Sequence, residues 1–152
     1  MATSAESRLA ELGIALPSLP APGGTYVPVK TVGHLVFLAG VISNTSEGVI
    51  TGTIGVDRNV EDGYAAARAC ALTHLSVLRN HLGSLDAIRS IVSVSGYVNA
   101  VAGFADSPKV INGASDLFVE LFGESGRHVR AAIGVSALPR NALVETQMIV
   151  EI

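Results

Sequence analysis

Cysteine occurs only once in the 152-residue chain, so an intramolecular disulfide is excluded. We interpret Cys70, which lies in an alanine-rich helical pattern, as a small core residue of a protein from a reducing compartment. A run of about 18 apolar residues is also missing, and the acidic N-terminal segment has no apolar stretch of signal-peptide length. These absences predict a cytoplasmic protein that has no membrane partner.

Charged residues are scarce, at 15% of the chain, and the net charge is −3. The ten lysine and arginine residues are spread thinly and form no stripe that could follow a phosphate backbone, so we expect no nucleic-acid partner. Hydrophobic residues make up 49%, which is too many for a disordered chain and leaves few charges for a monomer surface. The length suits one domain, residues 1–152, with part of its apolar surface in a subunit interface.

Motifs for the common cofactors and nucleophiles are absent. The chain contains no GxxxxGKS/T loop, no GxGxxG after a strand, no HExxH and no GxSxG. Cys70, His74 and His81 fall on one predicted helix, but no further ligand cluster or CxxC spacing accompanies them. We therefore expect neither a metal nor an organic cofactor.

The first half of the chain has the pattern of a short helix, several strands and a long helix. Residues 4–12 have helical spacing and lead into a proline-rich connector that ends at residue 24. Strand patterns follow at 27–33, 34–42 and 48–55. Asn59 and Asp62 then mark the start of an amphipathic helix that Gly83 ends.

The second half predicts a strand, a helix and two final strands. Val92, Val94 and Val98 lie on the apolar face of an alternating segment. A helix follows over 107–123, and the last segment has the pattern of a hairpin around a turn at 138–141. This order of elements predicts an α+β fold, with two helices on one face of a mainly antiparallel sheet.

Arg130 is the unusual residue of the final pair of strands because its neighbours are apolar. A hairpin closed at 138–141 sets Arg130 opposite Ile149. One face of this hairpin then carries His128, Arg130, Glu145 and Gln147. A guanidinium fork fits the two oxygens of a carboxylate, so Arg130 is a candidate anchor for a small carboxylate ligand. The alternative is an ordinary ion pair with Glu145 or another acid.

The segment from Val129 to Val150 closely resembles the signature of the RidA/YjgF family, with the arginine strand, the Leu138-Pro139 pair and the acid at Glu145. From Tyr26 onward, further residues match those of the family pattern in the same order along the chain. The resemblance implies a chorismate-mutase-like fold and a homotrimer with three clefts between subunits. It also implies cofactor-free hydrolysis of a 2-imino acid or an enamine to a 2-oxo acid and ammonia.

The resemblance implies a role for each matching residue. Arg130 holds the substrate carboxylate, and Tyr26 closes the cleft. The backbone at Ala132 contacts the substrate, and Gly40 keeps the pocket wall thin. Glu145 handles the attacking water, although an adjacent arginine would lower the pKa of its carboxyl and weaken it as a base.

Four further residues affect the expected chemistry. Gln147 and Ala39 replace family residues that carry an acid and a hydroxyl, and an amide cannot take a proton from water near neutral pH. Glu124 could project into the cleft as another acid, or be a solvated loop charge. His128 could donate to a substrate or relay a proton, or be a structural histidine.

Two functions of different class therefore stay open. One is an imine or enamine deaminase with Arg130 as anchor and Glu145 as the water-handling acid. The other is a non-catalytic binding protein for a small 2-oxo acid or a similar carboxylate. The ribonuclease activity for which the wider family is sometimes named is disfavoured by the acidic net charge.

Overall fold

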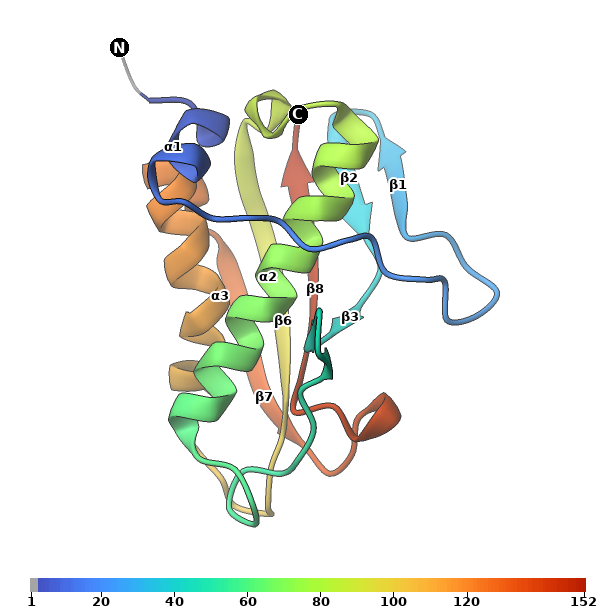
Figure 1. Ribbon diagram of the computed structural model, residues 1–152, viewed down its shortest axis with the longest axis vertical. Helices are drawn as coiled ribbons and strands as arrows, with labels where there is room; N and C mark the ends of the chain where they lie inside the picture. Colours follow the sequence, from blue (N-terminus) through green and yellow to red (C-terminus); the bar gives the residue numbers. More distant parts are fainter. Residues whose placement is uncertain (1–2) are drawn as a thin grey trace.

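The computed structural model describes residues 3–152 and places three helices over one face of a sheet (Figure 1). The helices are α1 (Ala5–Glu11), α2 (Val60–Leu82) and α3 (Ser107–Phe122). The strands are β1 (Val29–Val32), β2 (Leu35–Leu38), β3 (Val41–Ile42), β4 (Asn44–Thr45), β5 (Gly48–Val49), β6 (Ser90–Asn99), β7 (Val129–Val135) and β8 (Val144–Glu151). The α+β class and the mostly antiparallel sheet are as the sequence predicts.

The main sheet has the strand order β1-β2-β8-β6-β7, and β3 pairs with β8 beyond the end of β2. Strands β6 and β7 run parallel, whereas the other pairs of this sheet are antiparallel. The short strands β4 and β5 pair only with each other. The longest strands, β6 and β8, therefore form the centre of the sheet, and β7 is an edge.

Helix α2 begins and ends where the sequence predicts. Asn59 accepts from the Asp62 backbone N–H at 2.8 Å, and the Asp62 side chain accepts from the Asn59 N–H at 3.0 Å. This reciprocal capping satisfies two backbone donors that the helix leaves free. Gly83 ends the helix at a φ of 85°, a left-handed conformation that suits glycine.

Cys70 lies in the buried face of α2 and confirms the prediction of a core residue. Its Sγ is 3.6 Å from the Val41 carbonyl and 3.7 Å from the Val144 carbonyl, so α2 lies close above the sheet. Burial raises the pKa of this thiol to about 12. A thiol that stays protonated at neutral pH is a poor nucleophile, so Cys70 packs and does not react.

The predicted terminal hairpin is wrong. Strand β7 pairs in parallel with β6, which lies between β7 and β8. Parallel neighbours need a long crossover connection, and α3 supplies it as part of a β6–α3–β7 unit. The tight turn at Pro139–Asn141, with Arg140 and Asn141 both at a φ of 56°, then sends the chain past β6 to β8. Arg130 consequently lies beside Val94 on β6 and not opposite Ile149.

The apolar face of β6 also differs in one residue from the prediction. The register shifts between Ile91 and Ser93, so Val92 lies in an irregularity and is only half-buried. Ile91 is buried in its place, together with Val94 and Val98. An extra residue in a strand reverses the alternation before it, which the sequence pattern does not reveal.

The two faces of the sheet differ in their surroundings. The helix-facing residues of β8 are buried, among them Met148 and Val150, whereas Glu145 and Gln147 project from the opposite face. That opposite face has no covering layer within residues 3–152, and its large apolar side chains are exposed. They include Phe37 (41% exposed), Val129 (70%) and Ile133 (50%). A patch of this kind is typical of a surface that another subunit covers.

In the part of the chain that the structure describes, no helix is both long enough and apolar enough to cross a bilayer.

Candidate functional site

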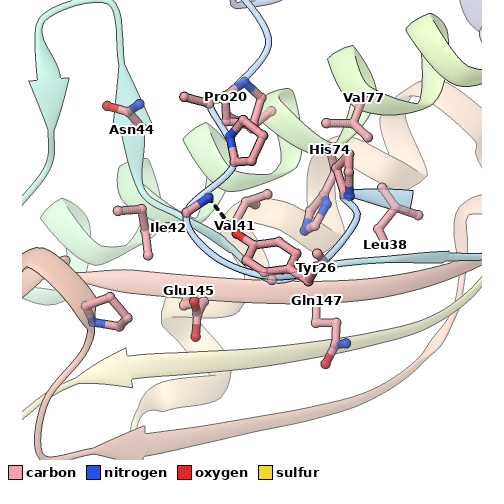
Figure 2. Close-up of a pocket in the computed structure, with 18 of the residues that line it drawn as sticks. Pro20, Tyr26, Leu38, Val41, Ile42, Asn44, His74, Val77, Glu145 and Gln147 are labelled. Carbon is pink, nitrogen blue, oxygen red and sulfur yellow. Dashed lines mark hydrogen bonds between the residues drawn. The ribbon is translucent and has the colours of Figure 1, made fainter. Parts of the chain in front are cut away.

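A pocket of about 940 Å³ opens between the N-terminal connector and the sheet (Figure 2). It forms where the strand is interrupted between β2 and β3, at Ala39 and Gly40. This interruption leaves a gap beside β8. The segment from Pro20 to Pro28 forms one wall, and its prolines restrict the backbone there. They are Pro20, Pro22 and Pro28. The floor comes from β8 and the inner wall from α2.

Tyr26 lines this pocket, and its role as a lid stays a prediction. Its hydroxyl oxygen accepts a hydrogen bond from the Gly23 N–H at 3.3 Å, drawn as a dashed line in Figure 2. A Cβ at Gly24 would lie 3.3 Å from the tyrosine ring, so the glycines let the ring fold back on the connector. The side chain is still 52% exposed, and it can contact a ligand or a second subunit.

Glu145, on β8, lines the same pocket (Figure 2). A Cβ at Gly40 would lie 3.3 Å from Glu145 Oε1, so a larger residue at position 40 would press on the carboxylate. Partial burial raises the pKa of this carboxyl above its ordinary value. A carboxylate of raised pKa is a better acceptor of protons from water near neutral pH. The expected lowering of its pKa by an adjacent arginine is absent within one chain.

Gln147 and Ala39, the two departures from the family pattern, both line the pocket. Gln147 projects on the same side as Glu145, two residues further along β8 (Figure 2). Its amide can donate to and accept from a water molecule but cannot take its proton. Glu145 is therefore the acid available to this pocket among the residues that line it.

His74 is a buried residue of the pocket wall. From the sequence we did not expect it to bind a metal. Its Nε2 lies 2.9 Å from Thr146 Oγ1 and 3.1 Å from the Thr146 carbonyl, and Nδ1 is buried without a partner among the described residues. Burial lowers the pKa of this imidazole to about 4, so the ring is neutral at pH 7. No cluster of potential metal ligands occurs within residues 3–152.

Arg130 lies outside the pocket, on the helix-facing side of β7. It donates from Nη1 to Asn112 Oδ1 at 2.7 Å and to Ser115 Oγ at 3.0 Å. It also donates from Nη2 to the Pro108 carbonyl at 3.3 Å. No carboxylate pairs with it in residues 3–152, so the alternative of an ion pair with Glu145 does not hold within one chain. The guanidinium is fixed and exposed, and its charge is not neutralised.

The other candidate residues near Arg130 are also outside the pocket. His128 contacts Ser115 and the Gly126 carbonyl, and Glu124 is exposed and pairs with Arg127 at 3.2 Å. Ala132 pairs with Gly96 on β6 and packs partly against the core, on the same face of β7 as Arg130. Glu124 and His128 therefore make local contacts at the start of β7.

The predicted single face with His128, Arg130, Glu145 and Gln147 does not exist. The side chains at 130 and 145 point to opposite faces of the sheet, from strands that β6 separates. Two strand spacings place the backbones of β7 and β8 roughly 10 Å apart. One chain thus has two separate half-sites, a pocket half with Tyr26, Gly40 and Glu145, and an arginine half with Arg130 and Ala132.

Residues 6–152 match the protein family described as "YjgF/chorismate mutase-like, putative endoribonuclease". The chain belongs to the YjgF family. The resemblance carried by residues 129–150 is therefore confirmed, and so is the chorismate-mutase-like fold.

Several relatives of this YjgF-family chain cover nearly its whole length. "Protein TCP17" of Trypanosoma cruzi is 40% identical over 148 residues, which are 96% of this chain and 92% of that protein. The crystal structure of Atu1372 from Agrobacterium tumefaciens, a protein of unknown function, is 40% identical with a TM-score of 0.88, and the match covers 97% of this chain and 91% of that one. A "putative endoribonuclease" from Shewanella oneidensis MR-1 is 33% identical with a TM-score of 0.94, over 99% and 100% of the two chains.

RidA from a Psychrobacter species shares the fold at 24% identity and a TM-score of 0.61, over 90% of this chain and 98% of that one. This likeness supports the architecture and does not assign an activity.

Some functional candidates of the YjgF-family chain were missed by sequence reasoning. Arg140 lines the pocket from its left-handed turn, and Ser115 binds Arg130 from the middle of α3. The sequence did contain a signal for Ser115. It follows Asn112 by three positions on the same helix, and residues three apart share a helix face. Arg140 had no such signal, since its position depends on the course of the turn.

Proposed function

We propose that this protein hydrolyses the carbon–nitrogen double bond of a small 2-imino acid, or of the imine tautomer of an enamine, in a cleft formed by two subunits. The observation that carries the proposal is the pair of complementary half-sites. Arg130 offers an unneutralised guanidinium, and Glu145 offers a carboxylate of raised pKa in a pocket. A carboxylate anchor and a water-handling acid are the two groups that this hydrolysis needs.

The two half-sites of one chain cannot serve the same substrate, because they lie on opposite faces of the sheet with β6 between them. A cleft that contains both Arg130 and Glu145 must therefore take them from different subunits. The exposed apolar side chains of the uncovered sheet face give a reason to associate. A closed ring of three subunits, as the family resemblance implies, would repeat the same contact three times and leave no unpaired edge.

The chemistry follows from the two groups. Arg130 of one subunit binds the carboxylate and so places C2 of the imine beside the pocket half of the next subunit. Water adds through its oxygen to C2 while Glu145 accepts its proton, and the electrons of the double bond move to nitrogen. Glu145 returns the proton to the nitrogen, which gives a neutral carbinolamine. Glu145 then passes the proton of the new hydroxyl to the amine, the C–N bond breaks as the C=O bond forms, and the products are ammonia and a 2-oxo acid. Gln147 orients the water or the added hydroxyl.

The second candidate function is binding of a 2-oxo acid without turnover. Gln147 and Ala39 favour it, because these two pocket residues supply neither an acid nor a side-chain hydroxyl. Arg130 and the pocket would still hold a carboxylate ligand.

The test is the release of ammonia and pyruvate from freshly generated 2-iminopropionate. Wild-type protein should accelerate release over a no-protein control, and Glu145→Gln should lower kcat about 10²-fold to 10⁴-fold, because an amide cannot accept the proton of water. Glu151→Gln is the matched control, since Glu151 is on the same strand outside the pocket and binds Ser90. Its kcat should stay near the wild-type value. A wild-type protein that gives no acceleration would exclude this reaction and favour the binding protein.

A further inference from the structure

We infer that Asn112, Ser115 and His128 are positioning residues that hold the Arg130 guanidinium in its ligand-binding orientation. In this arrangement His128 acts through Ser115 and does not exchange a proton with the substrate. The inference rests on the proposed function, because it takes Arg130 as the carboxylate anchor.

The hydrogen-bond distances assign the protons of this network. His128 Nδ1 lies 2.7 Å from the Gly126 carbonyl, which can only accept, so Nδ1 carries the ring proton. Nε2 of the neutral ring then accepts from the Ser115 hydroxyl at 2.9 Å. The Ser115 oxygen in turn accepts from Arg130 Nη1 at 3.0 Å. Burial and, less strongly, the charge of Arg130 lower the pKa of His128 and keep the ring neutral, against the raising effect of the Gly126 hydrogen bond.

These contacts use some guanidinium donors and leave others free. Nη1 donates to both Asn112 and Ser115, and Nη2 donates once, to the Pro108 carbonyl. A guanidinium has five N–H donors, so Nε–H and one Nη2 hydrogen remain. Adjacent nitrogens of a planar group can bind the two oxygens of one carboxylate in parallel. The network therefore leaves Arg130 with a pair of donors suited to a carboxylate.

The partners of Arg130 are all neutral, and this affects the ligand. An amide, a hydroxyl and a backbone carbonyl orient the guanidinium without cancelling its charge. A carboxylate at position 112 would orient it equally well but would compete with the substrate for the same charge. Asn112 thus serves both geometry and electrostatics.

Two close backbone contacts hold the network in place. A Cβ at Gly113 would overlap the Tyr64 carbonyl on α2, and a Cβ at Gly126 would overlap the Phe118 carbonyl on α3. Glycine at both positions lets α3 lie directly against its neighbours. The Asn112 amide and the Gly126 carbonyl, at the two ends of the network, are therefore fixed by packing.

The test measures pyruvate affinity by calorimetry and the steady-state constants for 2-iminopropionate. Asn112→Ala and Ser115→Ala should each weaken pyruvate binding and raise KM about tenfold, because each removes one hydrogen bond to a charged group. Asn112→Asp should weaken binding further by neutralising Arg130. In the Arg130→Ala background, neither alanine substitution should change the residual affinity, since their effect passes through the guanidinium.

His128 is tested by the division of its effect between kcat and KM. His128→Ala should raise KM about tenfold and leave kcat within about threefold, whereas loss of a catalytic proton donor would lower kcat at least about 100-fold. His128→Gln should restore most of the loss, because its amide oxygen can accept from Ser115. Tyr64→Phe, which removes a 2.7 Å contact to Asp116 between α2 and α3, is the control for loosened helix packing. It should leave KM unchanged.

The outcomes separate this inference from the proposed function. If Arg130→Ala weakens pyruvate binding but Asn112→Ala and Ser115→Ala do not, the positioning network is wrong and the anchor stands. Equal effects of these substitutions in the presence and absence of Arg130 would also overturn the network. If Arg130→Ala leaves pyruvate binding unchanged, the proposed function itself fails and the network fails with it.

Discussion

Replacing Arg130 by alanine should weaken the binding of pyruvate about 10²-fold to 10³-fold, because two charge-assisted hydrogen bonds are lost together. The same change should lower kcat/KM for 2-iminopropionate by at least this factor, since the carboxylate is bound in both the ground state and the transition state. Arg130→Lys should retain little of the affinity. An ammonium keeps the charge, but it cannot make the three contacts to α3 and still offer two parallel donors.

Arg127→Ala is the matched control for this prediction. Arg127 belongs to the same segment, is exposed and pairs only with Glu124 in the described part of the chain. Its removal subtracts an equal charge from a site near Arg130 and should change pyruvate affinity by less than about twofold. A similar loss in both variants would show that net charge, and not the fixed guanidinium, attracts the ligand.

Gly113→Ala should destabilise the fold by about 3 kcal/mol or more, the largest stability effect that we expect from a single added methyl group. A Cβ at this position would overlap the Tyr64 carbonyl and approach Ala67 Cβ at 3.2 Å. The obstacle is backbone in the second turn of α2, so no side-chain rotation relieves it and the helices must separate. In the absence of a clash, alanine would stabilise a helix by about 1 kcal/mol relative to glycine. A destabilised variant would therefore show that the steric clash outweighs this gain.

Chemical denaturation of the two alanine variants measures this effect. Gly134→Ala is the control, because its Cβ would meet no atom nearer than 3.7 Å. We expect its free energy of unfolding to stay within about 1 kcal/mol of wild type. A Gly113→Ala protein of wild-type stability would mean that α2 and α3 lie further apart than the structure places them.

The helices could be predicted from the sequence because their signals are local. Asn59 and Asp62 make the predicted capping contacts, and Gly83 adopts the left-handed conformation that ends α2. Such signals act within a few residues and need no knowledge of the rest of the fold.

The pairing of β7 could not be predicted in the same way. A polar turn between two apolar strands has the same pattern whether the strands pair directly or pass on either side of a third strand. The decision depends on where α3 returns the chain, and therefore on packing that includes Gly96 against Ile111. The consequence was large, because the wrong pairing brought Arg130 and Glu145 onto one face.

The structure brings some of the predicted site residues together, and their roles stay predictions. The two-residue spacing of His128 and Arg130 placed them on one side, and both contact Ser115. Tyr26, Gly40 and Glu145 were expected near one another, and they line one pocket. Neutral partners for the arginine were not foreseen, because a serine in a helix carries no sign of what it faces across the fold.

The division of the site between subunits is tested most directly by mixing inactive variants. Arg130→Ala and Glu145→Gln proteins should each be nearly inactive on 2-iminopropionate when made alone. Coexpressed in equal amounts, the two variants should assemble into mixed forms of the proposed trimer. In about one quarter of the clefts, one subunit then supplies an intact arginine and the next subunit an intact glutamate. Recovery of about a quarter of the wild-type rate is the predicted result. Coexpressed variants that form mixed oligomers but recover no activity would contradict a cleft built from two subunits.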